Sequence, residues 1–272
     1  MKLSLILDLD SQYKDLQEKV PYVDLSGLSG VNGYCSDEAA ECFRQEIRAV
    51  DTADVPEQAE APDSPFPMAR RKPYSGIHLF GSGNYHYISK FFLETIPEPF
   101  NLLLIDNHPD MEAPAFPLLS CGSWVLDSLR DLPNLQQVCM VGARPYLLGE
   151  CMRSEGAPFA DRVTLLQTDP KPLQSKESAS SARAAKKLSA VSAIPNDLPL
   201  YISIDKDALS TEYAVTDWDQ GDMTLKELEG LLTAVRSHKL LGADICGDSR
   251  TESDRDRECN RRTTMEILNI LS

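Results

Sequence analysis

The sequence predicts a three-layer α/β/α fold built on a mainly parallel central sheet. Short apolar runs rich in β-branched residues recur along its 272 residues, and amphipathic stretches separate them. Continuous apolar runs are typical of strands that are buried on both faces of a parallel sheet. Strands that alternate with helices in this way favour helical layers on both sides of the sheet.

Seven apolar runs are predicted as strands: Leu3–Leu9, Gly76–Phe80, Leu102–Ile105, Gln137–Val141, Val163–Leu166, Leu200–Ile204 and Leu240–Ile245. A Ser or Thr before a helix can accept a hydrogen bond from a free backbone N–H, so Ser36 and Thr224 mark two helix starts. The predicted helices are Asp37–Val50, His86–Thr95, Ser123–Leu129, Ser178–Ser192, Leu225–Ser237 and Glu258–Leu271.

Two segments interrupt this alternation. Asp51–Pro73 is rich in Pro, Ala, Asp and Glu, and Asp169–Ser181 is rich in Pro, Lys and Ser. These compositions predict surface insertions. A single parallel α/β sheet can extend over a chain of this length, so we expect one domain over residues 1–272, with insertions near 51–73 and 169–181.

The charge balance limits the classes of partner. The formal net charge is -15 and the isoelectric point is near 4.7, so the surface repels nucleic-acid phosphates and anionic lipid headgroups. Hydrophobic residues make up 42% of the chain and charged residues 25%, which is ordinary for a soluble globular protein. We therefore expect a small-molecule substrate, with no nucleic acid and no membrane.

The N-terminus and the cysteines predict a cytoplasmic protein. Charged residues appear too early for a signal peptide, and no apolar run approaches the roughly 20 residues that span a bilayer. The seven cysteines are odd in number, scattered, and lack a CxxC pair. They are expected to be reduced thiols, mostly in the core.

Three potential metal ligands follow one predicted strand. In Leu102-Leu-Leu-Ile-Asp106-Asn-His108-Pro-Asp110 they occupy alternate positions. Successive side chains of an extended segment point to opposite sides, so all three can face one site. The alternative is a polar loop in which an aspartate caps the following helix.

Two further segments carry similar chemistry. Leu200-Tyr-Ile-Ser-Ile-Asp205-Lys-Asp207 places two aspartates on one face, with Lys206 turned away, although Asp is also common in turns after strands. His86 lies in a glycine-containing turn after another strand, where a purely structural hydrogen bond is the alternative. All of these residues fall at the carboxyl ends of predicted parallel strands, where open α/β sheets build their sites.

Four carboxylates and two imidazoles form an oxygen-rich ligand set. Such a set suits manganese better than a closed structural zinc site, and six ligands suit two ions better than one. Two neighbouring ions can share a water, lower its pKa and stabilise a tetrahedral intermediate. The set therefore predicts hydrolytic chemistry.

At these residues the chain resembles the ureohydrolases, the family of arginase and agmatinase, whose fold is related to that of the histone deacetylases. Asp106-Asn-His-Pro-Asp110 is similar to the family's Asp-Ala-His-x-Asp motif, and Ser203-Ile-Asp205-Lys-Asp207 to its Ser-x-Asp-x-Asp motif. Gly83-Asn-Tyr-His86 matches Gly-Gly-Asp-His loosely. The resemblance covers roughly residues 76–247. It implies an arginase-like fold and a full manganese ligand set: His86, Asp106, His108, Asp110, Asp205 and Asp207.

The substrate-binding residues depart from the family. By the resemblance Asp110 also hydrogen-bonds the bridging hydroxide, but the guanidinium-binding glutamate falls on Gly247 and the proton-shuttling histidine falls near Cys121-Gly-Ser-Trp124. Asp248 is the carboxylate closest to the vacant position, so Asp110 and Asp248 are the predicted catalytic residues. Two residues outside the motifs have two interpretations each. Trp218 is a pocket wall or a loop anchor, and Arg144 binds a substrate carboxylate or forms a structural ion pair.

The resulting hypothesis is a dinuclear metal-dependent hydrolase, with manganese as the expected ion, that uses a metal-bridging hydroxide to cleave a carbon–nitrogen bond in a small guanidino or amide substrate. Zinc and iron are the alternative ions. A mononuclear zinc amidohydrolase similar to the deacetylases, and a metal-stabilised binding protein without turnover, are the alternative functions. Because family members often form oligomers, a homo-oligomer is also left open.

Overall fold

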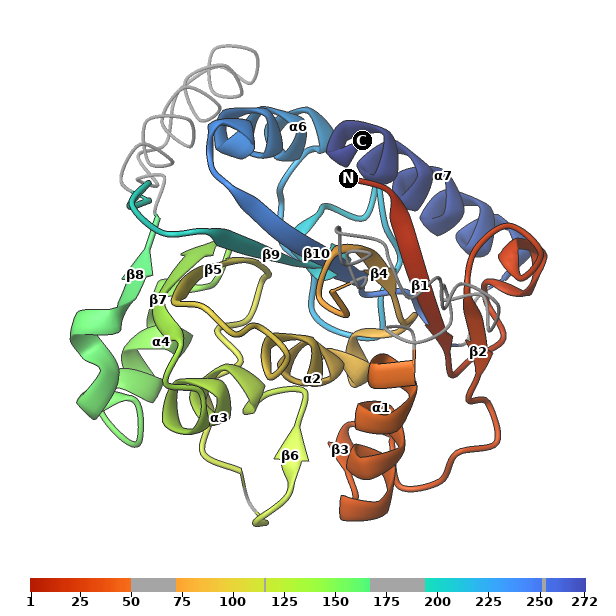
Figure 1. Ribbon diagram of the computed structural model, residues 1–272. Coiled ribbons are helices and arrows are strands. Elements are labelled where there is room, and N and C mark those ends of the chain that lie inside the picture. The colour runs from red at the N-terminus through yellow and green to blue at the C-terminus, as the bar shows by residue number, and fades with distance from the viewer. Residues whose placement is uncertain (50–71, 115, 167–193, 251–252) are drawn as a thin grey trace, which may run out of the picture.

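The computed structural model describes residues 1–49, 72–114, 116–166, 194–250 and 253–272. Its centre is an eight-stranded sheet in the order β2-β1-β4-β10-β9-β5-β7-β8, and every pair of neighbours in it is parallel (Figure 1). The strands are β1 (Leu3–Asp8), β2 (Tyr22–Asp24), β4 (Gly76–Leu79), β5 (Phe100–Ile105), β7 (Leu135–Val141), β8 (Val163–Leu165), β9 (Leu200–Asp205) and β10 (Leu240–Cys246). All seven predicted strands are thus confirmed. The short edge strand β2 was not predicted.

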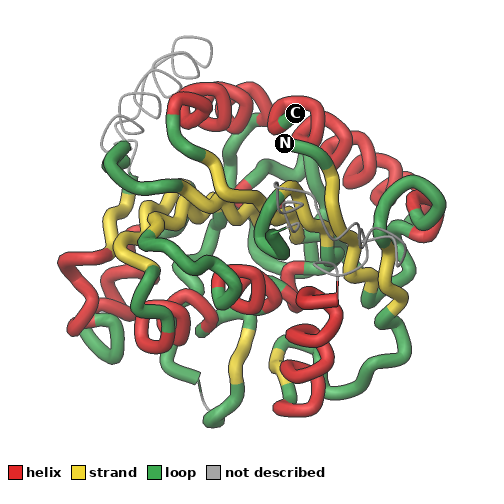
Figure 2. Tube along the Cα trace, in the orientation of Figure 1, coloured by secondary structure: helices red, strands yellow, loops and turns green. Residues whose placement is uncertain are grey.

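Helices cover both faces of the sheet. They are α1 (Asp37–Ala49), α2 (Ile88–Leu93), α3 (Trp124–Asp131), α4 (Pro145–Met152), α6 (Leu225–Ala234) and α7 (Asp254–Leu271), with 3-10 turns that include η2 (Gly83–Tyr85) and η4 (Lys206–Ala208). In Figures 1 and 2, α1 to α4 lie below the sheet and α6 and α7 above it. The three-layer α/β/α fold is confirmed.

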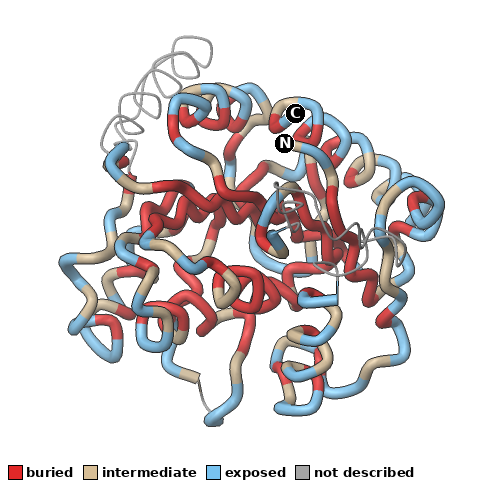
Figure 3. Tube along the Cα trace, in the orientation of Figure 1, coloured by how far each residue is buried: buried red, intermediate tan, exposed pale blue. Residues whose placement is uncertain are grey.

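The alternation of side chains along each strand divides the core in two. Leu102 and Leu104 of β5 pack in the cluster that contains Phe43 of α1. Leu103 of the same strand packs in the cluster that contains Ile267 of α7. Both faces of the sheet are therefore buried, as Figure 3 shows along the central strands, and this explains why the strands appear in the sequence as unbroken apolar runs.

Two of the predicted helices differ most from the observed ones. The segment 86–95 follows η2, and its regular helix is only Ile88–Leu93. The last helix starts at Asp254, four residues before the predicted start, because Ser253 and Asp256 form a capping box. That first turn carries only charged residues, so apolar periodicity alone could not find it.

Several predictions lie outside the described residues. The helix Ser178–Ser192 and the insertion near 169–181 are among them, as is the insertion near 51–73 except for its last two residues. The expectation of a single domain stays a prediction. All seven cysteines are free thiols and five are buried, as predicted. In the described part of the chain no helix is long and apolar enough to cross a membrane.

Candidate metal centre

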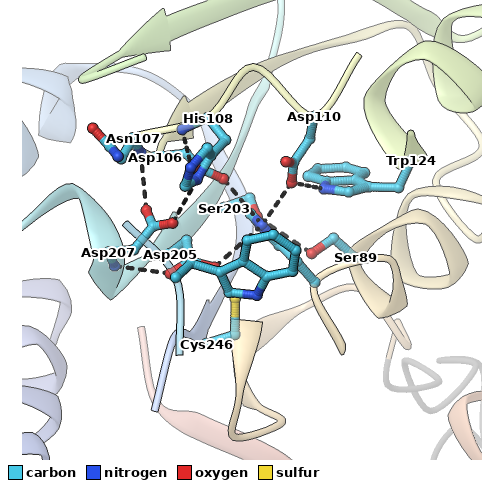
Figure 4. A network of polar contacts seen from close by, with 12 residues as sticks. Ser89, Asp106, Asn107, His108, Asp110, Trp124, Ser203, Asp205, Asp207 and Cys246 are labelled. Atoms are coloured by element: carbon cyan, nitrogen blue, oxygen red, sulfur yellow. Dashed lines mark hydrogen bonds and ion pairs between the residues drawn. The ribbon is translucent and has the colours of Figure 1, made fainter. Parts of the chain in front are cut away.

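The predicted ligands meet at the carboxyl edge of four neighbouring strands in the middle of the sheet. β4 leads into the turn that holds His86, β5 leads to Asp106, and β9 ends at Asp205. β10, which lies between β4 and β9 in the sheet, ends at Cys246. Carboxyl ends of parallel strands point to the same edge, so short runs after each strand bring distant residues together (Figure 4).

The first group of candidate ligands surrounds His86. This side chain is 1% exposed, and its Nδ1 lies 3.1 Å from Asp106 Oδ2, 3.0 Å from Asp110 Oδ2 and 3.6 Å from Asp205 Oδ2. Nδ1 nevertheless has no hydrogen-bond partner among the described residues. A buried ring nitrogen that faces three carboxylates without bonding to them is the arrangement expected around a cation.

The opposite side of the same ring shows which nitrogen is free to bind. His86 Nε2 donates to Ser203 Oγ at 2.8 Å, because Ser203 Oγ itself donates to Asp244 Oδ1 at 2.7 Å. Ser89 Oγ donates to the same Asp244 oxygen at 3.1 Å. This series of hydrogen bonds keeps the proton on His86 Nε2 and leaves the Nδ1 lone pair directed at the carboxylates. Outer hydrogen bonds orient metal-binding histidines in the same way.

The second group is built on His108. Its Nδ1 lies 2.7 Å from Asp207 Oδ2 and 3.6 Å from Asp106 Oδ1. The backbone N–H of Asn107 donates to the other Asp207 oxygen at 2.9 Å. Asp106 therefore presents one oxygen to each histidine. His86, Asp106 and Asp110 form one compact set of potential ligands, and Asp106, His108 and Asp207 form another.

Asp205 lies between two glycines that leave room for its carboxylate. A Cβ on Gly83 would lie 2.7 Å from Asp205 Oδ2, and a Cβ on Gly247 would collide with Asp205 Oδ1. Gly247 also has a φ of +97°, which other residues rarely adopt. A side chain at either position would collide with the Asp205 carboxylate. This explains why the turn that leads to His86 carries a glycine at position 83.

The electrostatics of the cluster show excess negative charge. Burial, with the Asp106 carboxylate as the next cause, raises the pKa of Asp110 to about 7. The same two causes raise the pKa values of Asp205 and Asp207. Burial acts upward on the pKa of Asp106 as well, but the two neighbouring histidines, His108 first, outweigh it and lower that pKa. Four carboxylates held this close need added positive charge to stay ionised together.

Trp124 is a functional contact that the sequence analysis missed. It is fully buried, and its Nε1 donates to Asp110 Oδ2 at 2.6 Å. Asp110 itself has a φ of 49°, in the left-handed region that a residue other than glycine rarely adopts. The indole therefore holds a strained residue in place. The signal that could have pointed to this contact was the tryptophan in Cys121-Gly-Ser-Trp124, the segment where the resemblance to the ureohydrolases predicts a histidine.

Asp244 was also missed. A carboxylate inside the apolar run of β10 has to find partners, and its burial raises its pKa to about 6. Cys246 ends the same strand, and its Sγ donates weakly to Asp205 Oδ2 at 3.4 Å. Burial, then the neighbouring Asp205, raises the pKa of this thiol well above its usual range.

A small cavity of about 80 Å³ opens onto this cluster. Trp218 forms part of its wall and also anchors its own loop, because its Nε1 donates to Asn84 Oδ1 at 2.8 Å. Both interpretations of Trp218 therefore hold. The residues that line the cavity are Gly83, Asp106, His108, Pro109, Asp110, Glu112, Cys121, Gly122, Asp205, Asp207 and Trp218.

Asp248 is the predicted site residue that the structure does not bring to this cluster. Its carboxylate accepts hydrogen bonds from Lys206 Nζ and the Tyr13 hydroxyl, and it lines a separate cavity of about 220 Å³. Its backbone N–H donates to Gly81 O at 3.0 Å, which pins the chain. The shift that would bring this carboxylate to the vacant position would break a buried ion pair, so the expected catalytic role has no support in the geometry.

Arg144 is likewise outside the cavity lining. Its Nη1 lies 3.3 Å from Asp219 Oδ2, so the interpretation as a structural ion pair is the one observed.

Comparisons with known proteins define the class of fold. No family model matches the chain. An uncharacterized protein from Thermotoga maritima is 26% identical over 249 residues, covering 92% of this chain and 88% of that protein.

Among solved structures, the proclavaminate amidino hydrolase from Streptomyces clavuligerus has a TM-score of 0.65 at 13% identity and covers 99% of this chain and 91% of its own. The arginase from Bacillus caldovelox has a TM-score of 0.62 at 12% identity, covering 100% and 98%. The agmatine ureohydrolase of Thermoplasma volcanium has a TM-score of 0.59 at 15% identity, covering 99% and 89%. The chain therefore has the arginase-like α/β fold, as the motifs predicted.

Proposed function

We propose that this protein is a dinuclear metal-dependent hydrolase that cleaves a carbon–nitrogen bond in a small guanidino or amide substrate. The observation that carries the proposal is the pair of ligand groups that share Asp106 at the carboxyl edge of the sheet. The arginase-like fold of the chain supports it, since solved structures with this fold include an amidino hydrolase and several arginases.

The residues present fit two divalent ions. One ion would be held by His86, Asp106 and Asp110, with Asp205 in reach, and the other by Asp106, His108 and Asp207. The donors are carboxylate oxygens and imidazole nitrogens, which suit manganese, with zinc or iron as alternatives. The unbonded Nδ1 of His86 and the space left by two glycines independently support an ion there.

Two such ions, when bound, would lower the pKa of a coordinated water and would stabilise the negative charge that develops on the substrate. The protein's own contribution centres on Asp110. Its carboxylate accepts the proton that the attacking water loses and returns it to the departing nitrogen. Trp124 fixes the orientation of that carboxylate, and the hydrogen-bonded chain behind His86 fixes the ring that faces it.

The chemistry can be tested on purified protein that has been stripped of metal and then reloaded with manganese. The assay is a screen of guanidino compounds and N-acylated amines for release of urea, ammonia or amine. We expect turnover that Asp207→Asn lowers by at least about 100-fold, whereas Asp219→Asn, a carboxylate outside the cavity, leaves it unchanged. Folded, fully loaded protein that hydrolyses no member of either series would favour the non-catalytic alternative.

Arginine itself should be a poor substrate. No side chain can occupy position 247, and Cys121 in the cavity wall cannot replace an imidazole. A lost charged hydrogen bond weakens recognition by roughly 1.5–3 kcal/mol, and a missing acid–base group removes about 10²- to 10⁴-fold in rate. Urea release from arginine at an ordinary enzymatic rate, abolished by Asp248→Asn with both metals still bound, would contradict this and restore Asp248 to the site.

A further inference from the structure

A buried thiol lies behind the aspartate cluster, on the side away from the cavity. Cys246 ends β10 and is fully buried, and it does not appear among the described residues that line the cavity. Figure 4 shows its side chain pointing toward the cluster. The sulfur is therefore next to the candidate ligands but outside the space that a substrate would occupy.

Cys246 completes a third set of potential metal ligands. A ring nitrogen of His86, a carboxylate oxygen of Asp205 and Cys246 Sγ lie within 4.8 Å of one another, and all three side chains are buried. Asp205 Oδ2 is 3.6 Å from His86 Nδ1 and 3.4 Å from Cys246 Sγ. This Nδ1 is the buried atom for which the described part of the chain supplies no hydrogen bond. An ion that binds it would have sulfur within reach as well as oxygen.

The strand that carries Cys246 also orients His86. Alternate residues of a strand face the same side of a sheet, so Asp244 and Cys246 share one face, while Ile245 packs in the opposite core cluster. Asp244 Oδ1 accepts from Ser203 Oγ, which in turn accepts from His86 Nε2. β10 therefore fixes the orientation of the imidazole and places a thiol near the same ring.

The thiol differs from the other potential ligands in the ions that it prefers. Carboxylate oxygens suit manganese, whereas thiolate sulfur favours softer ions such as zinc. Without an ion, the Cys246 thiol donates its proton weakly to Asp205 Oδ2. A divalent ion would take the place of that proton, which passes to solvent, and would leave the thiolate as its ligand. The group made of Asp106, His108 and Asp207 contains no sulfur.

We infer that Cys246 is a ligand of the ion held at His86 and makes this position selective for a softer ion than manganese. The two positions of the centre then differ, because sulfur belongs to the donors of one ion, whereas the other ion has oxygen and nitrogen donors. The inference rests on the proposed function only for the presence of a divalent ion at His86. It adds a seventh ligand to the six that the motifs predicted.

Cobalt(II) is the first probe, because a thiolate bound to cobalt gives a charge-transfer absorption band in the near ultraviolet. Wild-type protein loaded with cobalt should show this band, and Cys246→Ser should lose it while still binding cobalt. Cys121→Ser is the matched control and should keep the band, since Cys121 lines the cavity but belongs to none of the ligand sets among the described residues. A wild-type spectrum without the band, or a band that Cys246→Ser retains, would overturn the inference.

Competition between zinc and manganese measures the selectivity. Residues that only support a ligand already change metal affinity by about 10- to 100-fold, so loss of the sulfur ligand should be at least as costly for zinc. The preference for zinc over manganese should therefore fall by at least about 10-fold in Cys246→Ser. An equal preference in Cys246→Ser and wild type would contradict the assigned selectivity.

X-ray absorption at the zinc edge needs no variant, so it also covers the case in which Cys246→Ser does not fold. Zinc-loaded wild type should show a sulfur neighbour at about 2.3 Å, and a shell of oxygen and nitrogen alone would overturn the inference. A sulfur neighbour in a protein that hydrolyses no guanidino or acylated-amine compound would leave the inference standing and the proposed function wrong. Hydrolysis by a protein without a sulfur neighbour would support the proposed function and end the inference.

Discussion

Two buried polar clusters lie on either side of Gly247, and both use residues from the ends of β9 and β10. On one side Asp205 and Asp207 join the four other predicted ligands and Cys246, and carboxylates outnumber the cationic groups that could neutralise them. On the other side Lys206, the residue between them, pairs with Asp248 and also donates to Thr264 Oγ1 at 2.9 Å.

The difference between these clusters separates function from structure. The Lys206 cluster is balanced in charge and its central groups have partners, so it needs nothing from outside the chain. The aspartate cluster is unbalanced in charge and contains His86 Nδ1, a buried nitrogen for which the described part of the chain supplies no hydrogen bond. Of the two, the aspartate cluster is the one with the features of a ligand-binding site.

Asp106→Asn should have the largest effect on function, because Asp106 belongs to both ligand groups. We expect loss of most bound metal and a fall in turnover of at least about 100-fold. Metal-free Asp110→Asn should in turn be more stable than metal-free wild type at alkaline pH, since burial and the Asp106 carboxylate raise the pKa of Asp110 to about 7 and its charge destabilises the fold above that pH. Denaturant unfolding with chelator present measures this, and a less stable Asp110→Asn protein would argue against an unbalanced cluster.

Lys206→Met should show the opposite pattern. It leaves Asp248 buried without its cation, which typically costs about 3–5 kcal/mol in the free energy of unfolding. The number of metals bound by folded protein should stay the same, because Lys206 faces away from the ligands. Adding Asp248→Asn should recover part of the stability. If Lys206→Met instead removes metal as fully as Asp205→Ala does, the assignment of faces along β9 is wrong.

Trp124→Phe tests the support of Asp110 with an intermediate effect. The ring remains, but the hydrogen bond to Asp110 Oδ2 is lost. Partners that orient groups at a metal site typically contribute about 10- to 100-fold in affinity or activity. We expect a loss of that size in kcat or metal affinity, measured by steady-state kinetics and metal titration. Unchanged values for both would show that the indole serves packing alone.

Arg144→Gln should have the smallest effect. The pair with Asp219 is at the surface, and exposed ion pairs contribute about 0–1 kcal/mol. Neither KM for any substrate nor the metal content should change. A selective rise in KM for a substrate that carries a carboxylate would return Arg144 to the substrate site.

The fold and the candidate ligands could be predicted from the sequence for a physical reason. Each ligand follows a strand buried on both faces, and such strands are visible as apolar runs. Because Asp106, His108 and Asp110 occupy alternate positions directly after β5, local backbone geometry alone brings their side chains to one site. The same logic failed for Asp248, because its direction depends on Lys206 and Tyr13, which contact it from other elements.

The residues that tune the site could not be predicted in this way. Trp124 meets Asp110 only after the chain has turned through β6 (Leu119–Ser120) and the start of α3. Asp244 could have been noticed in the sequence, because it is a carboxylate within an otherwise apolar predicted strand.

The most direct test of the central claim is a calorimetric titration of metal-free protein with manganese, with the number of bound ions confirmed by elemental analysis. Two ions per chain in wild type, falling to one in Asp207→Asn and remaining two in Asp248→Asn, is the predicted result. At 100 times the dissociation constant, each occupied site should add about 2.7 kcal/mol to the free energy of unfolding. A single ion per wild-type chain, with no loss of that ion in Asp207→Asn, would contradict the dinuclear centre.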